Sequence, residues 1–175
     1  HDATLIATGV YKARNINIEG TKLKNIFPAM DFLMASNRKG LGDQVKLFDD
    51  GTLNAENKKV VVVGGGDTAM DCVRTAVRQK AKSVKCLYRR DRENMPGSAR
   101  EVANAIEEGV EFLWLSTPTK FIGSEKVQNV EVYYGNNGKQ HNEPSDLKPE
   151  VRYLKLIYCG GKERKLRKRY LNEVK

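Results

Sequence analysis

The fold of this chain is decided by residues 59–69, which read Lys-Val-Val-Val-Val-Gly-Gly-Gly-Asp-Thr-Ala. The β-branched run at 59–63 is typical of a strand covered on both faces in a parallel sheet. Three glycines follow at once, and from Asp67 to Gln79 apolar residues recur at spacings of three and four. That spacing predicts a helix with one apolar stripe. Lys80 stands where a glycine would end this helix comfortably.

The glycines fit the pattern Gly64-x-Gly66-x-x-Ala69, a dinucleotide-binding fingerprint with alanine in the third place. Gly64 permits the tight turn, Gly66 leaves the backbone open to a pyrophosphate, and Ala69 lets the helix pack on the sheet. The N–H groups and partial positive charge of the helix N-terminus would face the phosphates. Asp67 and Thr68, in the first turn, could cap the helix or touch a phosphate or ribose hydroxyl. The alternative is a glycine-rich turn without a ligand.

The second strand, predicted at Ser83–Tyr88, indicates which dinucleotide is bound. An NAD site places an acidic residue about 20 residues on, to bond the ribose 2′-hydroxyl. Counting from Ala69, that position is Arg89, and Arg90 follows it. A planar, permanently charged guanidinium suits a 2′-phosphate, so the pair favours NADPH. The alternatives are a solvated basic turn, or Asp91 reaching a ribose hydroxyl.

The neighbouring segments extend the pattern to strand–helix–strand–helix–strand over residues 59–115, half of a doubly wound nucleotide fold. Ser98 and Glu101 have capping-box spacing at the second helix, and Gly109 closes it. The predicted fold class is α/β, a Rossmann-like parallel sheet with flanking helices and a small antiparallel β extension.

The remaining segments carry weaker signals. We predict a strand at 3–7, loop at 10–27, a short helix at 28–36 that starts with a proline, and an exposed connection at 37–58. Later strands, read as antiparallel, are predicted at 121–122, 127–134 and 153–159.

The charge of the chain suggests a different class of function. The 175 residues, about one domain's length, carry a net charge of +9, of which residues 148–175 hold +7. The basic run at 162–170, with Tyr170 as a stacking residue, raises the alternative of a nucleic-acid-binding module. A solvated charge run is the usual case, so we expect no nucleic-acid partner. No apolar run approaches the roughly 20 residues that span a membrane, so we expect no membrane partner either. A third alternative, a purely structural scaffold, would not explain why the glycines and arginines stand where a dinucleotide needs them.

Histidine and cysteine are sparse and scattered. They occur only as Cys72, Cys86, Cys159, His1 and His141, without a C-x-x-C spacing. We therefore expect no metal site in this chain, and reduced thiols in a cytoplasmic protein.

Three segments, residues 62–76, 82–98 and 107–112, resemble the small (beta) subunit of bacterial NADPH-dependent glutamate synthases, of the FAD- and NAD(P)-dependent pyridine nucleotide oxidoreductases. They read Val-Val-Gly-Gly-Gly-Asp-Thr-Ala-Met-Asp-Cys-Val-Arg-Thr-Ala, Lys-Ser-Val-Lys-Cys-Leu-Tyr-Arg-Arg-Asp-Arg-Glu-Asn-Met-Pro-Gly-Ser and Glu-Glu-Gly-Val-Glu-Phe. The resemblance runs from about Asp2 to about Tyr134. Subunits of the dihydropyrimidine dehydrogenase and ferredoxin:NADP oxidoreductase type share the plan and are the alternatives within this class.

The resemblance implies that NADPH gives hydride to FAD. Electrons would then pass through iron–sulfur clusters to the glutamate synthase large subunit, where glutamine and 2-oxoglutarate give glutamate. Arg89 and Arg90 would hold the 2′-phosphate. The pyrophosphate would be held by Gly64, Gly65, Gly66, Asp67, Thr68 and Ala69. No catalytic residue is expected, because hydride transfer needs alignment and exclusion of water more than a protein acid or base.

The same resemblance suggests how the chain is divided. Residues 1–147 would be the NADPH-binding domain, with part of a linker to an FAD domain at the N-terminus. Residues 148–175 would be a basic tail, either disordered or a remnant of the FAD domain. The family's FAD fingerprint and iron–sulfur cysteines are absent from this sequence, so FAD and clusters are expected only in the full-length protein. The isolated chain should bind NADPH and remain inactive without a hydride acceptor.

Overall fold

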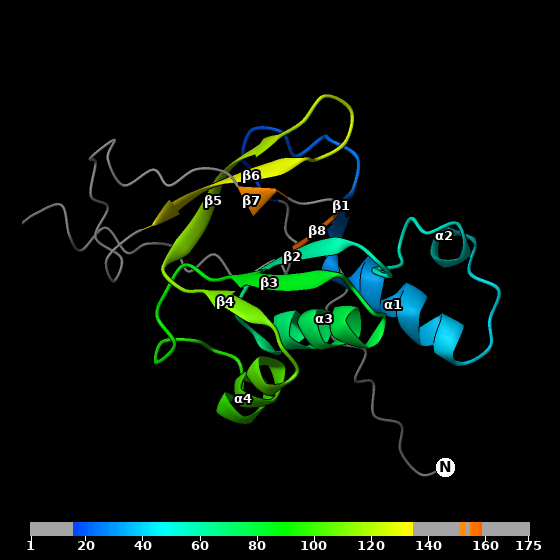
Figure 1. Ribbon diagram of the computed structural model, residues 1–175, viewed down its shortest axis with the longest axis horizontal. Coiled ribbons are helices and arrows are strands. Elements are labelled where there is room, and N and C mark those ends of the chain that lie inside the picture. Colours follow the sequence, from blue (N-terminus) through cyan, green and yellow to red (C-terminus); the bar gives the residue numbers. More distant parts are fainter. Residues whose placement is uncertain (1–15, 135–150, 153–154, 159–175) are drawn as a thin grey trace, which may run out of the picture.

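The main sheet of the protein is parallel and has five strands in the order β1-β8-β2-β3-β4 (Figure 1). The computed structural model describes residues 16–134, 151–152 and 155–158. The strands of this sheet are β1 (Ile26–Pro28), β2 (Lys59–Val63), β3 (Ser83–Leu87), β4 (Glu111–Leu113) and β8 (Lys155–Tyr158).

Two different layers cover the sheet (Figure 1). Helices α1, α3 and α4 lie along one face, and a three-stranded antiparallel sheet in the order β5-β6-β7 lies over the other. The helices are α1 (Ala29–Gly40), the short α2 (Lys46–Asp49), α3 (Asp67–Arg78) and α4 (Ala99–Glu107). The antiparallel strands are β5 (Ser116–Ile122), β6 (Asn129–Tyr134) and β7 (Val151–Arg152).

The central position of β2 explains its continuous apolar sequence. Val60 and Val62 face the helices and belong to one hydrophobic cluster, together with Phe32 of α1. Val61 faces the antiparallel sheet and packs with Phe121 of β5 in a second cluster. Because alternate residues of a strand point to opposite faces, a strand with two cores needs apolar residues throughout.

The structure confirms the predicted fold class and the strand–helix–strand–helix–strand series, which appears as β2, α3, β3, α4 and β4. The helix predicted at 28–36 is confirmed as α1, which begins at Ala29 and continues to Gly40. The loop predicted at 10–27 was wrong at its end, where β1 begins at Ile26, and the connection predicted at 37–58 contains the short helix α2. β1 and α2 have three and four residues, so their sequence carries little periodic signal.

The reading of 153–159 as an antiparallel strand was also wrong. Its described part, β8, runs parallel to both neighbours and lies between β1 and β2. In the sequence β8 comes after β5, β6 and β7. Its pairing with β1 and β2 is therefore non-local and cannot be predicted from the local sequence pattern. The strand predicted at 3–7 lies outside the described residues. So does residue 147, where a domain boundary was predicted.

The strand order sets the location of a site. The chain proceeds from β2 to β3 and β4 on one side, whereas β8 and β1 lie on the other. Such a reversal is a switch point, and ligands of open α/β sheets bind beside it at the carboxyl ends of the strands. Residues 64–66 follow the carboxyl end of β2 at this point.

Candidate dinucleotide-binding site

The three glycines after β2 have three different surroundings. Gly64 has a φ of 149°, a conformation that L side chains rarely adopt. Its N–H donates to the Leu87 carbonyl at 3.0 Å, and its carbonyl accepts from the Cys86 thiol at 3.3 Å. The tight turn predicted for Gly64 is confirmed, and it fastens the loop to the end of β3.

Gly65 is required by a neighbouring aromatic ring. A Cβ at this position would lie 2.3 Å from Cδ2 of Tyr88. Tyr88 is only 8% exposed, and its hydroxyl donates to the Asn94 carbonyl at 3.0 Å. The ring is therefore held against Gly65, which gives this glycine a packing reason that the sequence did not reveal.

Gly66 has no such reason within the protein. It is the N-cap of α3 with extended backbone (φ −93°, ψ 178°), and a Cβ there would meet no atom of the described residues within 4 Å. Within the described ranges, the backbone N–H groups of Gly66, Asp67 and Thr68 have no protein acceptor. Open space above unpaired donors at the positive end of a helix fits the pyrophosphate of a dinucleotide.

Asp67 binds a neighbouring helix instead of capping its own. Its Oδ1 accepts the Ser98 N–H at 2.9 Å, and α3 has no side-chain cap bond. One residue earlier, the Gly97 N–H donates to the Gly65 carbonyl at 2.9 Å. These two bonds tie the segment before α4 to the glycine loop. Thr68 is exposed, while Ala69 is fully buried, as its predicted packing role requires.

The capping box predicted for α4 does not form. Ser98 is the N-cap, but its side chain makes no cap bond. Asp67 supplies the acceptor that Glu101 would have offered to the Ser98 N–H, and Glu101 pairs with Arg74 of α3 instead. The helix was correctly predicted, whereas its capping partner comes from another element.

Arg74 and Glu108 hold α4 beside α3. Arg74 Nη2 lies 2.8 Å from Glu108 Oε1, and the guanidinium also pairs with Glu101. The hydrogen bond from Arg74 lowers the pKa of Glu108, and the same bond raises the pKa of Arg74. These partners are 27 and 34 residues apart, so no sequence spacing could have indicated them.

Arg89 and Arg90 lie directly beyond β3, beside the glycine loop that Leu87 contacts. Both are exposed, and neither side chain makes an ion pair or hydrogen bond with another described residue. Asp91 Oδ1 accepts from both nitrogens of Asn94, at 2.8 and 2.7 Å, so it stabilises its own turn. Two cations that pair with no side chain in the described part of the chain, next to the glycine loop, would fit a ligand phosphate.

The remaining expectations concern metal ions, cysteines, the basic run and membrane helices. In the described part of the chain, no group of three or more His, Cys, Asp or Glu could hold a metal ion. Cys72 and Cys86 are buried, and neither forms a disulfide with another described residue. The basic run at 162–170 lies outside the described residues, together with Cys159, His1 and His141. No helix among the residues described is long and apolar enough to cross a membrane.

Sheet order, glycine loop and helix N-terminus together define a Rossmann-like α/β protein of the dinucleotide-binding class. Among solved structures, the His57Gln mutant of FprA from Mycobacterium tuberculosis superposes with a TM-score of 0.65 at 14% identity, over 89% of this chain and 49% of that one. A match at that identity supports the fold alone.

Sequence comparison identifies the family. Residues 1–166 match the family model described as pyridine nucleotide-disulphide oxidoreductase, and the chain belongs to this family. The glutamate synthase [NADPH] small chain of Azospirillum brasilense is 62% identical over 132 residues, which are 75% of this chain and 27% of that protein. The same-named chain of Halomonas elongata is 44% identical over 151 residues, 86% of this chain and 31% of that protein. The chain thus spans about a third or less of these relatives, and the expected oxidoreductase family is confirmed.

Proposed function

We propose that this chain is the NADPH-binding part of a glutamate synthase small subunit, acting in the cytoplasm. The observation that carries the proposal is the space at Gly66 beside N–H groups of α3 that no described residue accepts, with Arg89 and Arg90 close by and likewise without a side-chain partner among the described residues. Relatives named as NADPH-dependent glutamate synthase small chains support the choice of cofactor and reaction.

The residues of this chain bind and orient the cofactor. Backbone donors of Gly66, Asp67 and Thr68 would hold the pyrophosphate, and Arg89 and Arg90 the 2′-phosphate. Bound NADPH supplies a hydride, for which FAD, carried with iron–sulfur clusters by the rest of the full-length protein, is the acceptor. The large subunit, as partner, would use the electrons to make glutamate from glutamine and 2-oxoglutarate. The isolated chain should accordingly bind NADPH without turning it over.

The test removes both arginines together and compares two cofactors. Arg89→Ala with Arg90→Ala should weaken NADPH binding about 30-fold or more, because each charge-assisted bond to a phosphate contributes roughly 1.5–3 kcal/mol, discounted here for exposure. NADH lacks the 2′-phosphate, so its affinity should change by less than about twofold. Isothermal titration calorimetry of the 175-residue chain measures both affinities.

A matched control removes another adjacent basic pair. Arg38 and Lys39 lie in the last turn of α1, and their partners are the exposed Asp43 and Asp49. Arg38→Ala with Lys39→Ala removes the same charge and should leave NADPH affinity unchanged. Equal losses for NADPH and NADH in the Arg89/Arg90 variant would disprove the 2′-phosphate assignment. Absence of NADPH binding by the wild-type chain would disprove the proposed function itself.

A further inference from the structure

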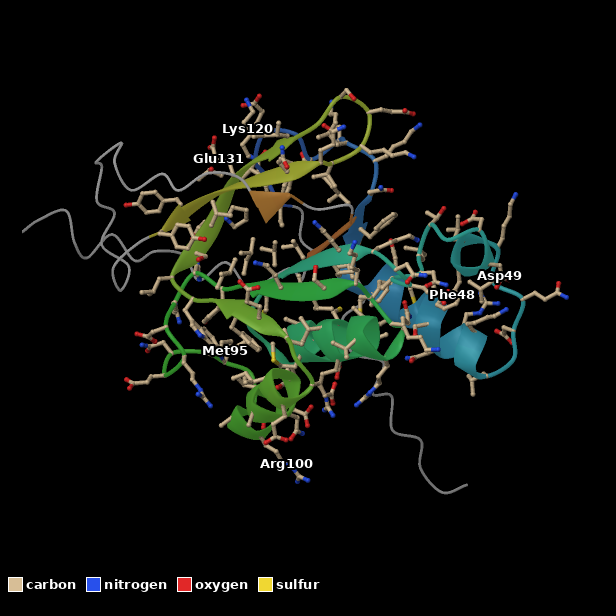
Figure 2. All side chains as sticks on the ribbon, viewed as in Figure 1. Phe48, Asp49, Met95, Arg100, Lys120 and Glu131 are labelled. Atoms are coloured by element: carbon tan, nitrogen blue, oxygen red, sulfur yellow. The ribbon has the colours of Figure 1, made fainter. Side chains whose placement is uncertain are left out.

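An aromatic stack lies at the carboxyl end of β4, outside the residues assigned so far. The rings of Phe112 and Trp114 are 4.7 Å apart at their centroids and only 10° from parallel. Both are half-buried, and both pack against the helix-side core, as Met95 does. Figure 2 shows Met95 where β4 and α4 approach each other. Trp114 is the single tryptophan of the chain.

The backbone around Trp114 is fastened to the arginine turn. The Tyr88 N–H donates to the Leu113 carbonyl at 3.1 Å, and the Leu115 N–H donates to the Arg90 carbonyl at 3.0 Å. Trp114 lies between these two bonded residues. Leu115 has a φ of 56°, an uncommon conformation for a leucine that directs the chain away from the sheet edge. The end of β4 and the arginine turn therefore form one local structure.

The geometry points to Trp114, supported by Phe112, as the surface on which the adenine of NADPH stacks, an inference that rests on the proposed function. With the pyrophosphate at α3 and the 2′-phosphate at Arg89 and Arg90, the ribose that carries this phosphate lies over β3. The sheet order β2-β3-β4 then leaves the base of the same nucleoside beyond β3, at the end of β4. A planar aromatic face suits a purine, since stacking needs no specific hydrogen bond.

The competing explanation is that the aromatic stack only fills space between β4 and α4. Trp114 can separate the two, because its emission reports on what touches the indole ring. A residue that only packs would keep its emission when a ligand binds elsewhere. The probe is 2′,5′-ADP, which carries the adenine and the 2′-phosphate but lacks the nicotinamide, so energy transfer to a reduced nicotinamide cannot cause a change.

The experiment titrates 2′,5′-ADP into the 175-residue chain and follows tryptophan emission and heat in parallel. We expect emission to fall with the same midpoint as the calorimetric isotherm. Trp114→Leu should weaken binding about tenfold, within the range reported for base–aromatic stacking. Trp114→Phe keeps an aromatic face and should stay within about threefold of wild type. Thermal unfolding without ligand checks that each variant folds.

The outcomes distinguish this inference from the proposed function. Heat of binding with unchanged emission, and equal affinity in Trp114→Leu, would overturn the adenine assignment and leave NADPH binding intact. No binding of 2′,5′-ADP to the wild-type chain would overturn both. If Trp114→Leu does not fold, the emission of the wild-type chain during the 2′,5′-ADP titration still decides the question.

Discussion

Gly65 and Gly66 are adjacent, yet the same substitution should have opposite consequences at the two positions. In Gly66→Ala the new methyl enters open space on a backbone that any residue adopts (φ −93°). Alanine is a poorer N-cap than glycine, but it also restricts the unfolded chain, and the two effects of about 0.5–1 kcal/mol oppose each other. We expect the free energy of unfolding to change by less than about 0.5 kcal/mol.

The affinity for NADPH, unlike the stability, should change strongly in Gly66→Ala. The methyl occupies the side from which a pyrophosphate must approach the N–H groups of α3. Losing one or more hydrogen bonds to a charged phosphate costs roughly 1.5–3 kcal/mol each. NADPH affinity should therefore fall by about tenfold to 150-fold.

Gly65→Ala should damage the fold instead. The added Cβ would lie 2.3 Å from Tyr88 Cδ2, far inside the roughly 3.5–4.0 Å of a normal carbon–carbon contact. The ring cannot retreat without losing the bond from its hydroxyl to the Asn94 carbonyl. Overpacking of this kind costs about 1–3 kcal/mol, which for a chain of this size lowers the melting temperature by roughly 2–12 °C.

The assay is thermal unfolding without ligand, followed by calorimetric titration with NADPH, for both variants and a control. Gly40→Ala is the matched control, because Gly40 ends α1 and its Cβ would also meet no atom within 4 Å. It should bind NADPH as wild type does. If Gly66→Ala binds NADPH normally, the phosphate does not lie on Gly66. If Gly65→Ala is as stable as wild type, Tyr88 does not pack as described.

Three further substitutions test the supports of the site. Lys80 has a φ of 61° at the end of α3. Lys80→Gly should therefore raise the melting temperature by about 2–4 °C, because the left-handed strain is relieved. A lower melting temperature would show that the Lys80 side chain makes compensating contacts. Asp67→Ala leaves the Ser98 N–H without its acceptor and should cost about 1 kcal/mol in urea unfolding, whereas unchanged stability would mean water replaces it fully. Because Arg74 lowers the pKa of Glu108 in the folded state, the stabilisation by Glu108 is present above the ordinary carboxyl pKa and is lost as pH falls through the lowered one. The stability advantage of wild type over Glu108→Gln should therefore shrink between about pH 5 and pH 3, and an advantage that grows in acid would contradict the assignment.

What the sequence could predict was local. The run at 59–63, the glycines and the periodicity of α3 all act within a few residues, and the structure has these elements where they were expected. Lys80 is instructive, because the sequence placed a lysine where a glycine is comfortable and the structure holds it at positive φ. Its N–H bonds the Val77 carbonyl at 2.8 Å, so the turn forms despite the side chain.

What the sequence could not predict depends on contacts between distant segments. The strand β8 pairs with β2 in the sheet although β3, β4 and the three antiparallel strands separate the two in the sequence. The acceptor at the start of α4 is Asp67, 31 residues before Ser98, although a suitable glutamate stands at the expected spacing. Local patterns list the groups that can pair, while tertiary packing decides which of them meet.

Tyr88 connects the parts of the candidate site to one another. Its ring lies on Gly65 and its hydroxyl holds the loop at Asn94. Its backbone accepts from the Ser116 N–H at 2.9 Å, where the antiparallel layer begins. One buried residue thus fixes the glycine loop, the turn that carries the arginines and the exit from β4. Binding of the proposed phosphates and nucleoside would therefore depend on the way Tyr88 holds these three segments together.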